Sequence, residues 1–583
     1  RKRMKKKLRV IIITLVLLLA GTGAFLWKMN DMNKKMEQKE QAKLKEERDL
    51  LEDQKDKAIN KVDAVNIIPL EMSGDKKNVV TIDYPSVEDI YDTNRSAQVE
   101  KNLTDIKKNK IFSLKDALWA YNPYGTNHSS MYVYFETSGK CYCKYTISVD
   151  DANIPDFTRT ARTGKAGNVS TEHEYQILGL VPGMKNYITL AMYNSDDELS
   201  EKQTFSIDIP ASPSGASAAL TAQKGRSKVT ITNGLYVLFQ DEKAKSKAIL
   251  MYDNSGVLRS EIPLCDNIAK NFMHIYDTMT YAVSSSKIVQ MNALGQVIKA
   301  VDLTGYKQSG EFAYDGYGNL YVIATPLQKN ASPKSKILEV ELESGKVSEV
   351  LDMNTLLKQV YKKTAGKKGA DWIDLNSIQV VGTNKLLLSS KKLSSIFKVS
   401  NVGSILPKIN YIIADKKLYK SYKGLQKKVL TKSDGTSSAS SQPTATESTQ
   451  RKNILHKEVK KDPFVSQYGQ EAIQTGRKTS GSYALMMLNN NVGTRSTNDH
   501  KSYYYRYQID ESSRTYQLKV KQEFGNTQKN GNAIKTSQGY LYCCSDQDYF
   551  VETDNTGKMI KAFHPGYKTD RVVKNDFMTF WFY

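Results

Sequence analysis

A short run of polar residues before an apolar strand pattern is the first place where this sequence could carry chemistry. Residues 371–378 read DWIDLNSI, so Asp371, Asp374 and Asn376 precede the alternating stretch QVVGTNKLLLSS. Carboxylates and an amide at such a position suit a cation, a metal ion or a sugar hydroxyl, and a carboxylate can also act as a nucleophile. The choice between these chemistries depends on the elements that position the run.

Short strand patterns separated by turn residues fill the segment that follows a helical pattern at 87–110. From Phe112 to about Pro210 they read MYVYFETSG, CYCKYTISVDD, HEYQILGLVPGM and NYITLAMYNSDDE. Runs of this kind, bounded by Gly, Asn and Asp, are typical of neighbouring strands in a small β-sandwich. The small-residue stretch ASPSGASAA, which starts at Ala211, then serves as a linker.

The remainder holds a recurring unit, in which an alternating strand ends in a polar turn and a second strand follows. Six copies occur: MYDNSGVLRSEI, VQMNALGQVIKAVDL, LEVELESGKVSEVLDM, FKVSNVGSIL, YQIDESSRTYQLK and VETDNTGKMIKAF. One such sheet cannot bury both faces alone, and its repetition is the signature of a propeller. The sequence therefore predicts a mainly β protein with a six-bladed β-propeller over 211–583. A Ser/Thr-rich stretch at 431–450 has too little apolar content to pack and is predicted to be a disordered insertion.

The N-terminal segment differs in composition from the rest. A basic tail, 1–9, precedes an apolar stretch, Val10–Trp27, which approaches the roughly 20 residues needed to cross a bilayer. Basic residues before this predicted transmembrane helix place the N-terminus in the cytoplasm. The bulk of the chain is then extracytoplasmic, in a single-pass protein of the cell membrane. A cleaved signal peptide ending near Thr22-Gly23-Ala24 is the alternative.

A charged segment follows the apolar stretch. Residues 28–62 are rich in helix formers and contain neither Gly nor Pro, so we expect a solvated helical stalk and then a linker at 63–86. Met29, Met32 and Met36 keep helical spacing before charge replaces the apolar stripe. A coiled coil that pairs two protomers into a homodimer is the alternative.

The net charge of +22 suggests nucleic-acid binding, but its distribution argues against that function. Seven basic residues lie in the first nine positions, others lie in loops such as 416–428, and no DNA- or RNA-binding motif accompanies them. The five cysteines show no zinc-site spacing and leave their disulfide status open. We expect neither a cofactor nor a bound metal.

Several segments resemble the PAPS-independent aryl-sulfate sulfotransferases, a family with a small N-terminal β domain and a six-bladed propeller. The N-terminal likeness lies in LWAYNPYGTNHSSMYVYFET (118–137) and HEYQILGLVPGMKN (173–186), where NPYGT and GL-x-PG are distinctive. In the propeller it runs through DWIDLNSI, LLLSSKKLSSIFKV, YGQEAI, MLNNN and YRYQIDE. The resemblance covers about residues 87–583.

The resemblance implies a ping-pong reaction, in which a histidine near the propeller axis takes the sulfuryl group of an aryl sulfate and passes it to a phenol. The nucleophilic histidine of active members corresponds to Glu471 in this sequence, and a second active-site histidine corresponds to Asp374. Asn376 is kept, whereas the expected arginines correspond to Lys391 and Tyr503. The family resemblance therefore predicts sulfuryl transfer, whereas the residues at the matching site positions argue against that activity.

His274, in FMHIYDTM, is the match for the family's remaining histidine and the candidate to replace the missing nucleophile. The two acquired carboxylates would repel a sulfate monoanion.

Three hypotheses on function remain open. The first is sulfuryl transfer from aryl sulfates to phenols by a modified site. The second is a non-catalytic propeller, a pseudoenzyme that binds a ligand or a partner protein at the cell surface, and the third is an enzyme of another class on the same scaffold.

Two further site types receive less support from the sequence. A Ca²⁺ site built from oxygens of Asp374, Asn376 and Glu471 has no loop spacing behind it. Ser389-Ser390 lacks a GxSxG elbow, which argues against a serine hydrolase.

Overall fold

The computed structural model of the chain describes residues 67–72, 78–245, 247–365, 369–434, 463–476, 481–492, 501–525, 527 and 530–583. The predicted basic tail, transmembrane helix and stalk lie outside the described residues, as does most of the predicted insertion. None of the helices in the described part of the chain has the length and apolar character needed to span a bilayer. From Ile68 onward the chain forms one unit.

Eight strands form the N-terminal β domain, in the order β1-β8-β7-β4-β3-β2, with β5 and β6 paired to opposite halves of β4. The 20-residue strand β4 holds the domain together, because one half pairs with β3 and β6 and the other with β5 and β7. β7 alternates buried and half-buried residues, as expected of a sheet with one face in a core. The strands are β1 (Ile67–Leu70), β2 (Val79–Thr81), β3 (Leu118–Tyr121), β4 (Ser130–Val149), β5 (Phe157–Thr160), β6 (Ser170–Leu178), β7 (Lys185–Tyr193) and β8 (Leu199–Asp208).

Two helices occupy the segment with the predicted helical pattern. α2 (Val87–Ile90) begins at a capping box, and α3 (Thr93–Lys107) begins after an Asp92 cap. The Ser96 hydroxyl of α3 accepts a hydrogen bond from the backbone N–H of Val297 in the propeller, at 3.0 Å. The helix therefore bridges the two domains.

No disulfide links the five cysteines, all of which lie in the described residues.

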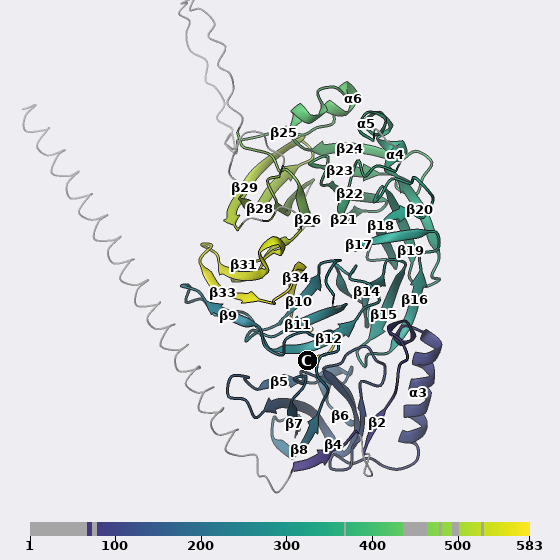
Figure 1. Ribbon diagram of the computed structural model, residues 1–583, viewed down its shortest axis with the longest axis vertical. Helices are drawn as coiled ribbons and strands as arrows, with labels where there is room; N and C mark the ends of the chain where they lie inside the picture. Colours follow the sequence, from purple (N-terminus) through teal and green to yellow (C-terminus); the bar gives the residue numbers. More distant parts are fainter. Residues whose placement is uncertain are drawn as a thin grey trace, which may run out of the picture. The chain divides into compact units, whose positions relative to one another are not determined.

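Six antiparallel sheets follow one another around a ring, which confirms the predicted six-bladed propeller (Figure 1). The innermost strands of four neighbouring pairs of blades, from blade 3 round to blade 1, contact one another. Two blades carry a fifth strand, β25 (Thr431–Lys432) or β9 (Thr221–Lys224). From the inside outward, blades 1 to 3 are β34 (Thr569–Asn575), β10 (Leu235–Gln240), β11 (Ala248–Tyr252), β12 (Leu258–Pro263); β13 (Phe272–Ile275), β14 (Thr278–Ser284), β15 (Lys287–Asn292), β16 (Val297–Asp302); and β17 (Tyr306–Tyr314), β18 (Asn319–Pro326), β19 (Lys336–Glu341), β20 (Val347–Asp352).

Blades 4 to 6 follow the same plan. Their strands are β21 (Leu375–Gly382), β22 (Lys385–Ser390), β23 (Ser395–Ser400), β24 (Lys408–Ile413); β26 (Gln470–Thr475), β27 (Ser482–Asn489), β28 (Ser502–Asp510), β29 (Thr515–Phe524); and β30 (Asn532–Lys535), β31 (Gly539–Cys544), β32 (Tyr549–Asp554), β33 (Met559–His564). Short helices in the connections are α4 (Met353–Leu356), α5 (Lys358–Thr364), α6 (Lys423–Gln426), and the 3-10 turns η2 (Ala166–Asn168), η3 (Lys416–Tyr419) and η4 (Ser545–Gln547).

The ring closes by an exchange of strands between its two ends. The last strand, β34, supplies the inner strand of blade 1 and pairs with β10. The first propeller strand, β9, adds to the outer edge of blade 6 through β33. Both ends of the propeller sequence are thus paired, so neither leaves an open blade.

The N-terminal β domain and blades 1 and 2 share one hydrophobic core, which also takes in four aromatic residues of the C-terminal segment 577–582. Arg259 on β12 is fully buried at the junction and donates to Asp253 at 2.8 Å, to the Gly179 carbonyl at 3.0 Å and to the Pro155 carbonyl at 2.8 Å. One guanidinium therefore joins the propeller to two loops of the N-terminal domain.

The buried His173 leads us to expect that acid destabilises the N-terminal β domain. Its ring is fully buried, stacks on Phe135, and lies 2.8 Å from the Tyr175 hydroxyl and 3.0 Å from Thr137 Oγ1. Burial lowers the pKa of the imidazole from 6.5 to about 4. Between pH 6.5 and 4 the unfolded chain binds a proton at His173 and the folded chain does not. The contribution of neutral His173 to the free energy of unfolding is therefore complete above pH 6.5 and is lost as the pH falls toward 4.

Acidification from pH 7.5 to 4.5 is therefore expected to cost about 2–3 kcal/mol of unfolding free energy through His173 alone. The His173→Gln variant keeps a hydrogen-bonding side chain that cannot titrate. Urea denaturation at both pH values should show a smaller pH dependence for the variant than for the wild type. Equal pH dependence in the two proteins would show that His173 is not the group responsible.

Candidate functional site

Four inner strands depart from regular pairing. The register shifts at 308–312 in β17, at 375–377 in β21, at 471–474 in β26 and at 569–571 in β34. Bulges redirect side chains and are over-represented beside active sites. Glu311 and Glu471 lie at two of these shifts, which release them from the regular alternation of their strands.

Residues Asp371–Asp374 of this run form a strained turn, and Leu375 and Asn376 begin β21. Asp374 has φ 45°, in the left-handed region that few non-glycine residues adopt. The Asp371 carboxylate accepts a hydrogen bond from the Asp374 N–H at 3.0 Å, and the Trp372 indole donates to Asn354 Oδ1 at 2.8 Å. The Asp374 carbonyl then accepts from the Lys391 N–H at 3.1 Å. The polar residues of this run therefore hold a turn that positions Lys391.

Glu471 of blade 5 lies in the interior of the propeller beside Lys391 of blade 4. The two side chains form an ion pair, and Asn490 Nδ2 lies 3.4 Å from the same carboxylate. Glu471 is only 4% exposed. Burial raises the pKa of Glu471 above its usual 4.5, although Lys391 and Lys270 oppose the shift. The carboxylate at this position is thus buried and already engaged by a cation.

Four more charged residues surround this pair. Lys270 and Asp570 lie 3.1 Å apart, and Arg571 donates to Glu311. Burial opposes charge on both cations, but Asp570 and Glu311 raise the pKa of Lys270 and of Arg571 above their usual values. We term the set the axial charge cluster, which consists of Lys270, Glu311, Lys391, Glu471, Asp570 and Arg571. Its three cations balance its three carboxylates.

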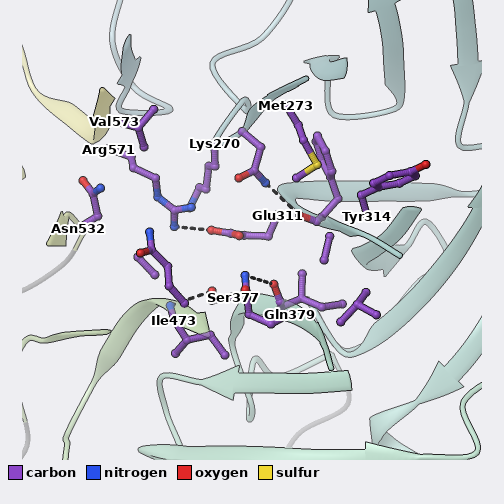
Figure 2. Close-up of a pocket in the computed structure, with 17 residues that line it drawn as sticks. Lys270, Met273, Glu311, Tyr314, Ser377, Gln379, Ile473, Asn532, Arg571 and Val573 are labelled. Atoms are coloured by element: carbon purple, nitrogen blue, oxygen red, sulfur yellow. Dashed lines mark hydrogen bonds and ion pairs between the residues drawn. The ribbon is translucent and has the colours of Figure 1, made fainter. Parts of the chain in front are cut away.

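A cavity of about 330 Å³, the axial pocket, adjoins the cluster (Figure 2). All six blades contribute to its wall through their inner strands or the residues just before them. Figure 2 shows Arg571 reaching toward Glu311, with Ser377 and Gln379 beneath them and Tyr314 farther along the wall. The volume and the mixture of apolar and polar groups suit a small organic molecule.

Two family models match the regions just described. The arylsulfotransferase (ASST) model matches residues 221–561, and the model of the arylsulfotransferase Ig-like domain matches residues 118–210. The chain belongs to the arylsulfotransferase family. The N-terminal β domain is therefore the family's Ig-like domain, and the family assignment predicted from the sequence is confirmed.

Other comparisons add no functional information. A search of curated proteins found no match. The WD40 domain of Neurospora crassa Pan2 is 6% identical, with 60% of this chain and 97% of that domain covered and a TM-score of 0.26. An auxiliary nutrient binding protein from Bacteroides thetaiotaomicron is 9% identical (75% and 94% covered, TM-score 0.27), and BamB from Moraxella catarrhalis is 7% identical (59% and 90%, 0.26). These likenesses are too weak to carry an argument.

Among the residues that the resemblance assigns to the arylsulfotransferase site, Glu471, Lys391 and Asn376 lie close together. Asn376 donates to the carbonyl of the residue preceding Glu471 at 2.8 Å, and its own Oδ1 is buried without a hydrogen-bond partner. The backbone carbonyl of Asp374 accepts a hydrogen bond from the backbone N–H of Lys391, whereas the carboxylate of Asp374 lies 2.8 Å from Lys334 Nζ. The carboxylate of Asp374 is thus directed to a different cation from that of Glu471.

His274 lies apart from these residues. Its side chain is exposed, and its ring packs edge-on against Phe580 with centroids 5.3 Å apart. The charged groups acting on it are Arg162 and Asp277, which do not belong to the axial charge cluster. Lys270, just before the same strand, lines the axial pocket, and the structure does not place His274 where it could replace the missing nucleophile.

Lys270, Glu311, Asp570 and Arg571 are site residues that the sequence reasoning missed. Lys270 and the pair Asp570-Arg571 stand just before or at the start of inner strands whose later residues are largely apolar, as in TDRVV. Glu311 follows Gly310, where a Cβ would lie 1.7 Å from a backbone carbonyl, so the close approach fixes the position of the carboxylate. For Lys270, Asp570 and Arg571, the sequence feature that could have identified them is a charged residue at the start of an apolar strand pattern. This feature identifies site residues only when it is known which strands line the propeller axis.

The described residues contain no group of three or more His, Cys, Asp or Glu side chains placed to hold a metal ion. The residues considered for Ca²⁺ face other groups: Asp374 faces Lys334, and Glu471 faces Lys391. The described side chains at the axis form charge pairs and hydrogen bonds.

Proposed function

We propose that this protein is a ligand-binding member of the arylsulfotransferase family, which holds a neutral phenol in the axial pocket and does not carry a sulfuryl group on residue 471. The observation that carries the proposal is the pairing of Glu471 with Lys391 inside a charge-balanced cluster. The family's reaction uses a neutral imidazole at this position. A buried carboxylate that is already engaged by a cation cannot serve in the same way.

A sulfate monoester would gain little from the cations at the axis. Arg571 is paired with Glu311, and Lys270 lies beside Asp570. Each unit charge at about 4 Å and an effective dielectric near 20 is worth about 4 kcal/mol, so the carboxylates cancel the attraction of the cations for an anion. A neutral phenol avoids this opposition.

The remaining features of the axial pocket suit a phenol ring. Ile473 and Val573 offer apolar surface on two sides of the cavity, while Ser377 and Gln379 offer hydrogen-bonding groups for a hydroxyl (Figure 2). A cavity of about 330 Å³ accommodates one substituted aromatic ring. The ring would therefore rest on apolar side chains while its hydroxyl meets polar ones.

Titration calorimetry with p-nitrophenol and with p-nitrophenyl sulfate tests this proposal. We expect the phenol to bind and the sulfate ester to show no measurable binding. Gln379→Trp should fill the pocket and abolish phenol binding, whereas Gln517→Trp, at a half-buried position of β29, should not. Preference for the sulfate ester, or phenol binding unaffected by Gln379→Trp, would refute the proposed site.

Sulfuryl transfer by a modified site is the second candidate function, and the family match favours it. Glu471 would then attack sulfur, form a mixed anhydride and release the phenolate as the aryl O–S bond breaks. A second phenol would then bond to sulfur through its oxygen, lose its proton to the phenolate released in the first step, and regenerate the carboxylate as the anhydride O–S bond breaks. Such turnover would require Glu471, which provides the means to tell the two candidates apart.

We further propose that Val10–Trp27 anchors the protein in a cell membrane with the Ig-like domain and the propeller outside the cytoplasm. The basic tail and the uncharged apolar stretch that follows it support this orientation. Protease added to intact cells should digest the propeller. Protection of the propeller until the cells are lysed would contradict the proposed orientation.

A further inference from the structure

A second cavity, of about 770 Å³, lies between blades 2 and 3, and we term it the blade 2–3 groove. Its wall is formed by the turns after β13, β17 and β19, together with residues of β15 and β16. In an antiparallel blade, the turns after the first and the third strand lie at the same face. The groove therefore opens on the face where the inner strands end, whereas Asn376, Glu471 and Asp570 stand where theirs begin.

Two tyrosines of the groove are largely exposed, Tyr317 at 84% and Tyr276 at 70%. Tyr276 has φ 53°, a left-handed conformation that is costly for a bulky residue and that recurs at ligand-binding sites. Its ring packs edge-on against Tyr314, with centroids 6.3 Å apart, so its orientation is held. A strained backbone that presents an aromatic ring to solvent points to a ligand that covers the ring.

The charged groups of the groove are already engaged within the protein. Lys299 Nζ donates to the carbonyls of Leu342 at 2.6 Å and Glu343 at 2.5 Å, and it is the one cation among the described lining residues. The Glu341 carboxylate lies 3.1 Å from Lys346. An anionic ligand would thus find its cation occupied and would face the carboxylates of Glu341 and Glu343.

The polar groups that remain are mostly acceptors. The amide nitrogens of Gln290 and Asn319 donate to Thr278 at 3.2 Å and to Asp315 at 2.8 Å, so their carbonyl oxygens are the groups that remain available as acceptors. The groove therefore suits a ligand that carries several hydrogen-bond donors but no negative charge.

We propose that the blade 2–3 groove binds a neutral carbohydrate. The C–H faces of sugar rings pack on aromatic side chains, and Tyr276 and Tyr317 offer large rigid surfaces at a low cost in side-chain entropy. Sugar hydroxyls would donate to the acceptors of Gln290, Asn319 and Glu343. A polyamine shares the donors and can also pack on tyrosine. The pairing of Glu341 with Lys346 disfavours it, since the polyamine would have to displace that cation.

This inference does not rest on the proposed phenol binding, because no residue lines both the axial pocket and the blade 2–3 groove. Saturation-transfer NMR on the full-length protein in detergent, with cellohexaose, maltohexaose and chitohexaose as probes, tests it. We expect saturation transfer to at least one of the three. Tyr317→Ala should weaken that binding by about tenfold, through loss of one stacked ring.

Two control variants define the site. Tyr583→Ala removes a tyrosine that is 56% exposed at the C-terminus and should leave glycan binding unchanged. Gln379→Trp, in the axial pocket, should also leave it unchanged, so failure of the phenol proposal and failure of this one are distinguishable. Absence of saturation transfer to all three glycans, binding that survives Tyr317→Ala, or binding of spermidine in place of the glycans would overturn the inference.

Discussion

Replacement of Arg259 by methionine is expected to lower the free energy of unfolding by about 3–5 kcal/mol. Methionine fills a similar volume but leaves the Asp253 carboxylate without its cation and the carbonyls of Gly179 and Pro155 without their donors. Arg259 is 0% exposed, so water cannot take over these contacts. The midpoint of urea denaturation of the full-length protein measures the effect.

Two further variants separate the role of the guanidinium from that of charge in general. Arg259→Lys should be nearly as destabilising, because a single ammonium group cannot donate to all three acceptors that the guanidinium reaches. Arg506→Met, at an exposed position of β28, should change stability by less than about 0.5 kcal/mol. An Arg259→Met protein as stable as the wild type would mean that the junction of the Ig-like domain and the propeller does not depend on this residue.

The second large effect is expected for Lys391→Met, at about 3 kcal/mol or more, because the variant leaves Glu471 buried without its closest cation. Burial already raises the pKa of Glu471, and loss of Lys391 should raise it further. A carboxyl whose pKa is higher in the folded state costs stability as the pH rises above its unfolded value of 4.5. The destabilisation should therefore shrink as the pH is lowered toward 4.5.

A double-mutant cycle isolates this pair. Lys391→Met with Glu471→Leu removes both charges and should recover most of the stability that Lys391→Met alone loses. Denaturation midpoints of the four proteins at pH 7.5 give the coupling free energy. Additive effects of the two substitutions would show that the two side chains are not coupled in the folded protein.

Much of the fold could be predicted from the sequence, because each blade repeats one local pattern. Runs such as VQMNALGQVIKAV carry both the strand alternation and the turn residue, and they appear as β15 and β16 with the turn between them. The closure of the ring could not be predicted in this way. The pairing of β34 with β10 joins residues from the two ends of the propeller sequence, and no local pattern specifies such a partner.

The site was predicted less completely, for a physical reason. Glu471, Asn376 and Lys391 were reached through segments that resemble a known family, and the structure brings them together. The charges that balance Glu471 come from other blades, and Lys270 differs from an ordinary surface lysine only by its place beside an inner strand. His274 was chosen by matching FMHIYDTM to the family's remaining histidine, and such a match does not reveal which side of a strand faces the axis.

Release of p-nitrophenolate from p-nitrophenyl sulfate, with phenol as acceptor, tests the central claim most directly. The full-length wild type and Glu471→Ala are assayed side by side, with a histidine-bearing arylsulfotransferase as the positive control. We predict no release above the buffer rate from either protein, because the carboxylate at residue 471 is held by Lys391 and repels the sulfate. Release by the wild type that disappears in Glu471→Ala would contradict the account and would establish sulfuryl transfer through this residue.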